Sequence, residues 1–123
     1  MQTRQLYHGT NGDNILSILA LGKLYPNAQH EVFFSSDTWQ TVFMHGADQK
    51  RKAAFAIKVE VTLPDQIVLV HTSTPGIPAT LLVQTIQPLA AKVLELYVRK
   101  PGEDGFVIEQ IRGELPIRNY LQR

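Results

Sequence analysis

The segment 53–63, AAFAIKVEVTL, constrains the fold more than any other part of this sequence. From Phe55 to Val61 every second residue is apolar, and polar residues such as Lys58 and Glu60 occupy the positions between. Because successive side chains of a strand point to opposite faces, this alternation predicts a strand with one buried and one solvent-facing side. The chain is therefore expected to form a sheet with its core on one face and solvent on the other.

Other segments predict further strands and helices. Strands are expected over residues 4–8, 31–36, 66–72 and 105–111, and a last strand or extended tail over 114–121. Helices are expected over 13–21, over 38–50 with about three turns, and over 79–100 with a division or kink at Pro88. The resulting order, β-α-β-α-β-β-α-β-β, predicts an α+β fold.

The first two expected helices have boundary signals. Asn11 to Asp13 supplies a turn and a cap candidate, and Gly22 lies where a helix-ending glycine is expected. Ser36 or Asp37 is a natural N-cap for the second helix. The starts of both helices are therefore encoded locally.

Composition excludes several classes of function. The chain has 123 residues, no cysteine and a formal net charge of +1. The length indicates one domain, residues 1–123, and the lack of cysteine excludes disulfides and Cys-based zinc sites. A net charge this small gives no electrostatic footprint for nucleic acid. The only basic cluster, Lys50-Arg51-Lys52, is typical of a solvated turn, with a phosphate contact as the alternative.

Targeting and metal-binding signals are also missing from the sequence. No apolar run reaches the length of a signal peptide core or a membrane span, so a cytoplasmic protein without a membrane partner is expected. The histidines show no i, i+4 pair with a carboxylate, so no metal ion is expected.

The tripeptide His8-Gly9-Thr10, at the end of the first expected strand, concentrates groups that can bind a ligand. Glycine leaves its backbone open to close approach by a flat ligand, histidine offers a directional ring nitrogen, and threonine offers a hydroxyl. Together they can hold a sugar edge and an amide. An ordinary strand end is the alternative, because Gly-Thr-Asn-Gly is rich in turn residues.

Four motifs in the right order resemble the ADP-ribosyltransferase superfamily, in particular its diphtheria-toxin-like and poly(ADP-ribose)-polymerase-like branch. They are HGT at 8–10, NILSILALG at 14–22, VFFSSD at 32–37 with the helix-like TWQTVFMHGA after it, and GEDGFVIEQ at 102–110. The resemblance implies that family's split antiparallel β-sheets with flanking helices. It also implies mono-ADP-ribosyl transfer from NAD to a macromolecular acceptor, with release of nicotinamide, and by analogy a bacterial or phage toxin or effector.

The same resemblance implies roles for individual residues. His8 would hydrogen-bond the adenosine-side ribose of NAD, with Thr10 supporting that ribose. The Gly9 backbone would hold the nicotinamide carboxamide, and Ser35 would line the nicotinamide pocket. NAD would be a substrate, and no metal cofactor is implied.

Three phenylalanines occupy aromatic positions of the resembled family. Phe33 or Phe34 stands at the aromatic position of the second strand, and Phe43 would stack on the nicotinamide ring. The family usually has tyrosine at these positions, and phenylalanine keeps the stacking face but loses the hydroxyl. Core packing is the alternative for each ring. Phe33 and Phe34 are not expected to share a role, because neighbouring strand residues face opposite sides.

The implied mechanism needs a carboxylate that stabilises the oxocarbenium-like centre and holds the ribose 2′-hydroxyl. Glu114 is the preferred candidate, because it begins the last expected strand in a segment loosely similar to the family's EYxVxD, from which Pro116 departs. Glu109 is the second candidate, since it interrupts an apolar strand and shares a face with Val107 and Ile111.

Other functions compete with this interpretation. An NAD-dependent RNA 2′-phosphotransferase has a similar His-Gly start, but also an extra domain and several arginines for the RNA phosphate. A degenerate module that binds ADP-ribose or a protein without catalysis is favoured if neither Glu109 nor Glu114 reaches the pocket, and a structural domain without a ligand is a further alternative. The acceptor and the oligomeric state are left open: the acceptor could be a protein side chain, a nucleic-acid base, a small molecule or water.

Overall fold

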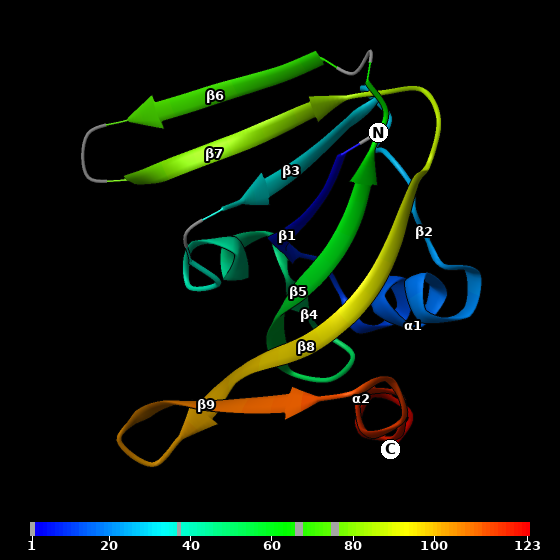
Figure 1. Cartoon of the computed structure of the whole chain (residues 1–123). Coiled ribbons are helices and arrows are strands. Elements are labelled where there is room, and N and C mark those ends of the chain that lie inside the picture. Colours follow the sequence, from blue (N-terminus) through cyan, green and yellow to red (C-terminus); the bar gives the residue numbers. More distant parts are fainter. Residues whose placement is uncertain (1, 37, 66–67, 75–76) are drawn as a thin grey trace.

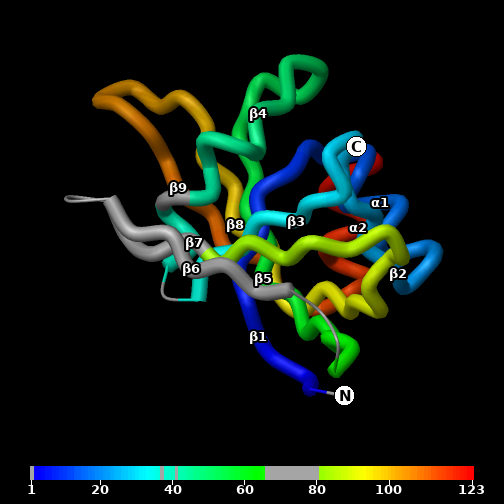
Figure 2. The backbone as a smooth tube through the Cα atoms, turned by 90° about the horizontal axis from the view of Figure 1, so that it is seen from above, coloured from blue at the N-terminus to red at the C-terminus, as the bar shows by residue number. Residues whose placement is uncertain are grey.

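The computed structural model describes residues 2–36, 38–65, 68–74 and 77–123. Within these residues nine strands form one curled antiparallel sheet, and two α-helices cover one of its faces (Figure 1). The strong curl of the sheet around the helices is clearest from above (Figure 2). The predicted α+β class is confirmed.

The elements have the following bounds. The strands are β1 (Gln2–Gly9), β2 (Lys23–Leu24), β3 (Glu31–Ser35), β4 (Ala47–Asp48), β5 (Ala53–Leu63), β6 (Val68–Thr74), β7 (Ile77–Gln84), β8 (Leu89–Gly102) and β9 (Gly105–Arg112). The helices are α1 (Gly12–Leu21), the 3₁₀ helix η1 (Thr41–His45) and α2 (Glu114–Leu121). No helix in the described part of the chain combines the length and apolar character needed to cross a membrane.

The sheet places β1 at its centre. The strand order is β2-β8-β5-β1-β3-β7-β6, with β4 added to β5 and β9 added to β8. β1 pairs with β5 along its whole length, from Gln2 opposite Leu63 to Gly9 opposite Ala56. The end of β1 therefore lies in the middle of the fold, between β5 and β3.

The core lies between the sheet and the two α-helices. The alternate residues of β5 from Phe55 to Val61 are fully buried on this side, as the sequence predicts, while Lys58 and Glu60 on the other side are half-buried. Apolar side chains of both helices complete the core, namely Ile15, Ile18, Ile117 and Leu121.

Helix α1 begins and ends where the sequence predicts. The Asn11 side chain caps it, with Oδ1 accepting a hydrogen bond from the Asn14 N–H at 2.9 Å. Gly22 follows it with φ of 67°, and its N–H donates to the Ile18 carbonyl at 2.8 Å. This left-handed conformation is the reason for a glycine at the C-terminal end.

The helix predicted over 38–50 is wrong. Only the short η1 forms there, followed by β4. Gly46 explains the interruption, because its backbone lies so close to β5 that a Cβ would come within 1.8 Å of the Phe55 carbonyl oxygen. The Phe55 N–H donates to the Gly46 carbonyl at 2.9 Å, which commits this backbone to the sheet. The cap predicted at Asp37 lies outside the described residues.

The helices predicted over 79–100 are also wrong, because this segment forms β7 and most of β8. Alanine, leucine, lysine and glutamate favour helix locally, but pairing partners decide strand formation. β7 pairs with β3 and β6, and β8 pairs with β5, β2 and β9. The loop predicted over 72–78 shortens to the connection between Thr74 and Ile77, whose residues 75 and 76 lie outside the described part.

The last predicted strand, 114–121, is instead the helix α2. Pro116 lies in its first turn, where its missing N–H costs no hydrogen bond. Ile117 and Leu121, four residues apart, are buried, whereas Leu115 is 64% exposed. This spacing has the period of a helix and joins the segment to the core.

Candidate functional site

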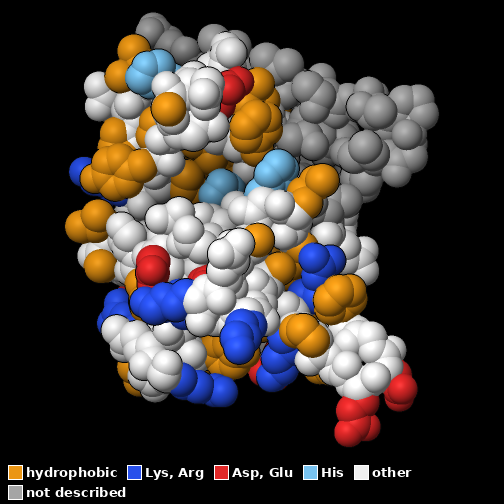
Figure 3. Space-filling view, turned by 180° about the vertical axis from the view of Figure 1, so that it is seen from behind, with side chains coloured by type: hydrophobic (Ala, Val, Ile, Leu, Met, Phe, Trp, Pro, Cys, Tyr) orange, Lys and Arg blue, Asp and Glu red, His pale blue; other side chains and the backbone are white. Residues whose placement is uncertain are grey.

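A cavity of about 520 Å³ opens where β1 ends and α1 begins. Residues 23–27 and β3 form its opposite wall. Of the predicted ligand-binding residues, His8, Gly9, Thr10 and Phe33 line this cavity. On the face seen in Figure 3, histidine side chains border a hollow in the middle of the molecule. The structure therefore brings the first sequence motif to a concave site.

His8 has a defined proton position in this cavity. Its Nδ1 lies 2.8 Å from the Phe33 carbonyl oxygen, which can only accept, so Nδ1 carries the proton. Burial lowers the pKa of His8, the hydrogen bond to Phe33 opposes this, and nearby His45 lowers the pKa further. The ring is therefore neutral near pH 7, and Nε2 is a hydrogen-bond acceptor.

Gly9 has a packing role that the sequence did not reveal. A Cβ at this position would lie 1.8 Å from the Val42 carbonyl oxygen of η1. The absence of a side chain therefore allows η1 to approach β1. Its backbone still lines the cavity, but a larger residue here would disturb the fold as well as any ligand contact.

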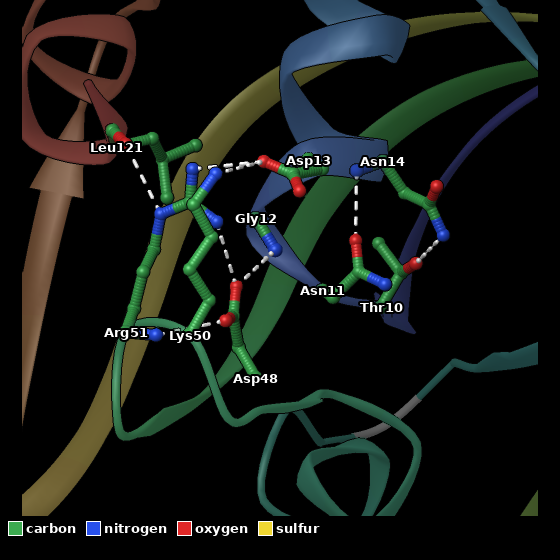
Figure 4. A network of polar contacts seen from close by, with 9 residues as sticks. All are labelled: Thr10, Asn11, Gly12, Asp13, Asn14, Asp48, Lys50, Arg51 and Leu121. Carbon is green, nitrogen blue, oxygen red and sulfur yellow. Dashed lines mark hydrogen bonds and ion pairs between the residues drawn. The ribbon is translucent and has the colours of Figure 1, made fainter.

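Thr10 and Asn14 form a polar pair at the cavity wall. The Thr10 Oγ1 accepts a hydrogen bond from the Asn14 Nδ2 at 2.9 Å, as Figure 4 shows. Thr10 is buried, whereas Asn14 on α1 is exposed and also lines the cavity. Thr10 thus orients a side-chain amide next to His8.

The two neighbouring phenylalanines of β3 face opposite sides, as predicted. Phe34 is fully buried in the core, with its ring centre 5.6 Å from that of His8. Phe33 lines the cavity and stacks on His45, with ring centres 6.1 Å apart and ring planes at 14°. Phe33 is therefore the aromatic residue of this pair that a ligand could contact.

Ser35 and Phe43, which the sequence predicts at a nicotinamide pocket, are not among the residues that line this cavity. Ser35 is buried, and its Oγ accepts a hydrogen bond from the Thr38 N–H at 3.2 Å. Phe43 is buried against Trp39, with ring centres 5.5 Å apart, and Arg99 lies 5.1 Å over its ring. Because η1 replaces the predicted helix, Phe43 packs on the sheet face opposite the core helices.

The two predicted catalytic carboxylates also lie elsewhere. Glu109 on β9 forms an ion pair with Lys100, and the Glu114 Oε1 on α2 lies 3.1 Å from the Arg118 Nη2. Neither residue lines the cavity. For Glu109 the sheet order explains this, because β8 and β5 separate β9 from β1.

Sequence reasoning missed two charged residues and a histidine that belong to the cavity. Glu31, Lys23 and His45 line it together with His8. Glu31 is half-buried and is the first residue of β3, a position with no sequence signal for a functional carboxylate. It is the acidic residue in the described lining of this cavity.

An ion-pair network centred on the buried Asp48 holds the start of α1 (Figure 4). The Asp48 Oδ2 accepts hydrogen bonds from the Gly12 N–H at 2.8 Å and from the Arg51 Nη1 at 2.9 Å. Burial opposes ionisation of Asp48, but the hydrogen bonds from Gly12 and Arg51 outweigh it and lower the pKa of this carboxyl. Arg51 also donates to Asp13 at 3.0 Å and to the Leu121 carbonyl at 3.1 Å.

The cavity offers a mixed set of groups to a ligand. It has an acceptor on His8, a side-chain amide on Asn14, a carboxylate on Glu31, an ammonium on Lys23 and an aromatic ring on Phe33. This set suits a ligand with hydroxyl groups, a flat ring and negative charge. No cluster of three or more metal-ligating side chains occurs in the described part of the chain. In comparisons with models of known protein families and with curated protein sequences, this chain matches none.

Proposed function

We propose that the cavity between β1 and α1 binds NAD through its ADP-ribose part, in a domain related to the ADP-ribosyltransferases. The observation that carries the proposal is the neutral His8, whose Nδ1 donates to the Phe33 carbonyl and whose Nε2 is left as an acceptor at a cavity. A ribose hydroxyl is a natural donor to this nitrogen. The His-Gly-Thr resemblance assigns the same role to this histidine.

The size and the lining of the cavity support this ligand. Its volume of about 520 Å³ falls within the usual range for small-molecule and cofactor sites, roughly 300–1,000 Å³. The Lys23 ammonium can neutralise a pyrophosphate charge, and the exposed part of Phe33 can contact a flat ring. These contacts match the three chemical parts of NAD.

Binding without catalysis is favoured over transfer by the positions of the two predicted carboxylates. Glu109 and Glu114 form ion pairs outside the cavity. A pocket that binds ADP-ribose but lacks these carboxylates corresponds to the non-catalytic alternative.

ADP-ribosyl transfer is the second candidate function, and Glu31 is the observation that favours it. Its carboxylate lines the same cavity and can stabilise the positive charge that develops on the ribose. In this reaction the nicotinamide–ribose bond breaks, and nicotinamide leaves with the bonding electrons. An acceptor oxygen or nitrogen then bonds to the anomeric carbon and loses its proton to the carboxylate or to water.

The binding proposal is tested by calorimetric titration of NAD and ADP-ribose into the wild type and the His8→Asn variant. An asparagine amide can still donate to the Phe33 carbonyl, but it provides no acceptor at the position of Nε2. We expect affinity to fall by about 1–3 kcal/mol, roughly fivefold to 150-fold. His30→Asn is the control, because this exposed histidine lies outside the cavity lining. Equal affinity in wild type and His8→Asn would refute the assignment.

Catalysis is tested separately by measuring nicotinamide release from NAD in the presence of cell lysate. If the chain is a transferase, Glu31→Gln should lose most release while still binding NAD. Glu109→Gln and Glu114→Gln should retain it, because neither carboxylate lines the cavity. NAD binding without release from the wild type would establish the binding module.

A further inference from the structure

A second cleft, of about 510 Å³, lies between the β4–β5 turn, the end of β8 and the end of α2. It shares no lining residue with the cavity at His8. Its described lining includes five cationic residues and no acidic one, although the whole chain has 12 Lys and Arg against 11 Asp and Glu. The cations are Lys50, Arg51, Lys52, Lys100 and Arg123.

Tertiary structure creates this concentration of charge. The cluster at residues 50–52 is extended by Lys100 from β8 and Arg123 from the segment after α2. The face in Figure 3 shows Lys and Arg side chains gathered below the histidine-lined hollow. The net charge of the whole chain is only +1, yet positive charge is in excess at this cleft.

Arg51 has a structural role in this cleft. It is held by Asp48 and Asp13, and it donates to the Leu121 carbonyl at the end of α2 (Figure 4). These bonds hold the β4–β5 turn against the end of α2. The turn and the helix end together form one wall of the cleft.

Two of the remaining cations have carboxylate partners that stay in contact with solvent. The Lys50 Nζ lies 3.7 Å from the Asp13 Oδ1, and both side chains are largely exposed. Lys100 pairs with Glu109, also in contact with solvent. Exposed ion pairs contribute little stability, so both ammonium groups can turn to a ligand anion.

Lys52 and Arg123 have no carboxylate within ion-pair distance in the part of the chain that the structure describes. Both are exposed. The Arg123 guanidinium lies 4.3 Å over the Tyr120 ring, which holds it at the cleft. The cleft therefore has two positive charges without an ion-pair partner among the described residues, and the aromatic contact holds one of them in place.

We propose that this cleft binds phosphate groups. Several cations converge on one concave site that has no acidic side chain among its described lining residues. This arrangement matches the charge and the multiple acceptor oxygens of a phosphate. The phosphates could belong to a small phosphorylated molecule or to a nucleic-acid strand, and these share the same recognition chemistry. The site is separate from NAD binding, because the two cavities have no residue in common.

The test uses the intact chain with three probes: inorganic phosphate, pyrophosphate and a fluorescent twelve-nucleotide oligothymidylate. Amide NMR shifts locate the first two, and fluorescence anisotropy measures the third. We expect shifts at Lys52, Lys100 and Arg123, and at least fivefold weaker binding in the double variant Lys52→Gln, Arg123→Gln. The control is Lys92→Gln, Arg4→Gln, which removes the same charges outside the cleft.

The arms of the experiment separate the two sources of phosphate. If the oligonucleotide binds no more tightly than pyrophosphate, the ligand is a small phosphorylated molecule. Tighter oligonucleotide binding indicates a strand, and the slope of log K against log salt should then fall in magnitude by about 1.4 in the double variant, roughly 0.7 for each lost phosphate contact.

Glu109→Gln gives a test in the opposite direction. Removal of this carboxylate releases Lys100, so pyrophosphate affinity should rise about twofold to fivefold. This variant also covers the case in which the double variant does not fold. The proposal is overturned if no probe shifts the cleft amides, or if neither the double variant nor Glu109→Gln changes affinity.

Discussion

At the scale of single residues, Asp48 shows how a buried charge can stabilise this fold. Asp48 is buried, yet its pKa is lowered, because Gly12 and Arg51 donate hydrogen bonds to it that outweigh the cost of burial. A carboxyl with a lowered pKa in the folded state stabilises the fold above its unfolded pKa. That contribution is lost as the pH falls through the folded pKa. The network at α1 should therefore weaken only in acid.

Asp48→Asn should reduce the free energy of unfolding by about 3 kcal/mol at pH 7, because it breaks a buried pair and leaves Arg51 with one fewer partner. The difference from wild type should shrink below about pH 4, near the ordinary pKa of an aspartate side chain in an unfolded chain. Urea unfolding at pH 7 and pH 3 measures both effects. Asp104→Asn, at an exposed turn residue, is the control and should stay within about 0.5 kcal/mol of wild type. An equal loss at both pH values would contradict the electrostatic explanation.

At the scale of elements, α2 depends on the core rather than on its own sequence. Its eight residues are too few for a stable isolated helix, and one of them is Pro116. Ile117 and Leu121 bury its apolar side against α1 and β8. The helix α2 is therefore stabilised by packing against the rest of the core.

Ile117→Ala should destabilise the protein by about 2–5 kcal/mol, because the buried side chain leaves a cavity in the core. Leu115→Ala should change stability by less than about 0.5 kcal/mol, since Leu115 is 64% exposed. If the segment were a strand, Ile117 and Leu115 would lie on the same face. The two substitutions would then reduce the free energy of unfolding by similar amounts. Urea denaturation of both variants distinguishes helix from strand at this segment.

At the scale of the whole molecule, the sheet is built from strands that are distant in sequence. β1 pairs with β5, from Gln2 opposite Leu63, and β5 pairs with β8, with Ile57 opposite Leu96. Non-local pairing requires large loops to close before contacts stabilise them, which slows folding. The curl of the sheet around both helices makes each part depend on the others (Figure 2).

Refolding should accordingly take milliseconds to seconds, as for other proteins dominated by non-local strand pairing. The single tryptophan, Trp39, is a suitable probe because it stacks on Tyr97 of β8, with ring centres 4.9 Å apart. Stopped-flow fluorescence after dilution from urea measures the rate, and far-ultraviolet circular dichroism should give the same rate if folding is two-state. A dominant phase faster than a millisecond would contradict this expectation.

Local patterns determined several features from the sequence alone. Alternation in 53–63 predicted β5 with its correct bounds, and the turn at Asn11 to Asp13 together with Gly22 predicted the ends of α1 to within a residue. The His8-Gly9-Thr10 motif, predicted to bind a ligand, lies at a cavity, and ligand binding there remains a prediction. These features depend on side-chain period and on glycine and cap chemistry, which act over a few residues.

Only the tertiary structure decided the rest. Residues 79–100 have local helix preference, but distant strands supply pairing partners that make them β7 and β8. Glu109 on β9 is separated from His8 on β1 by the strands β8 and β5. Local periodicity in the sequence does not determine this strand order. The cleft likewise combines Lys52, Lys100 and Arg123, which are separated along the chain and meet because β8 and α2 end at the same place.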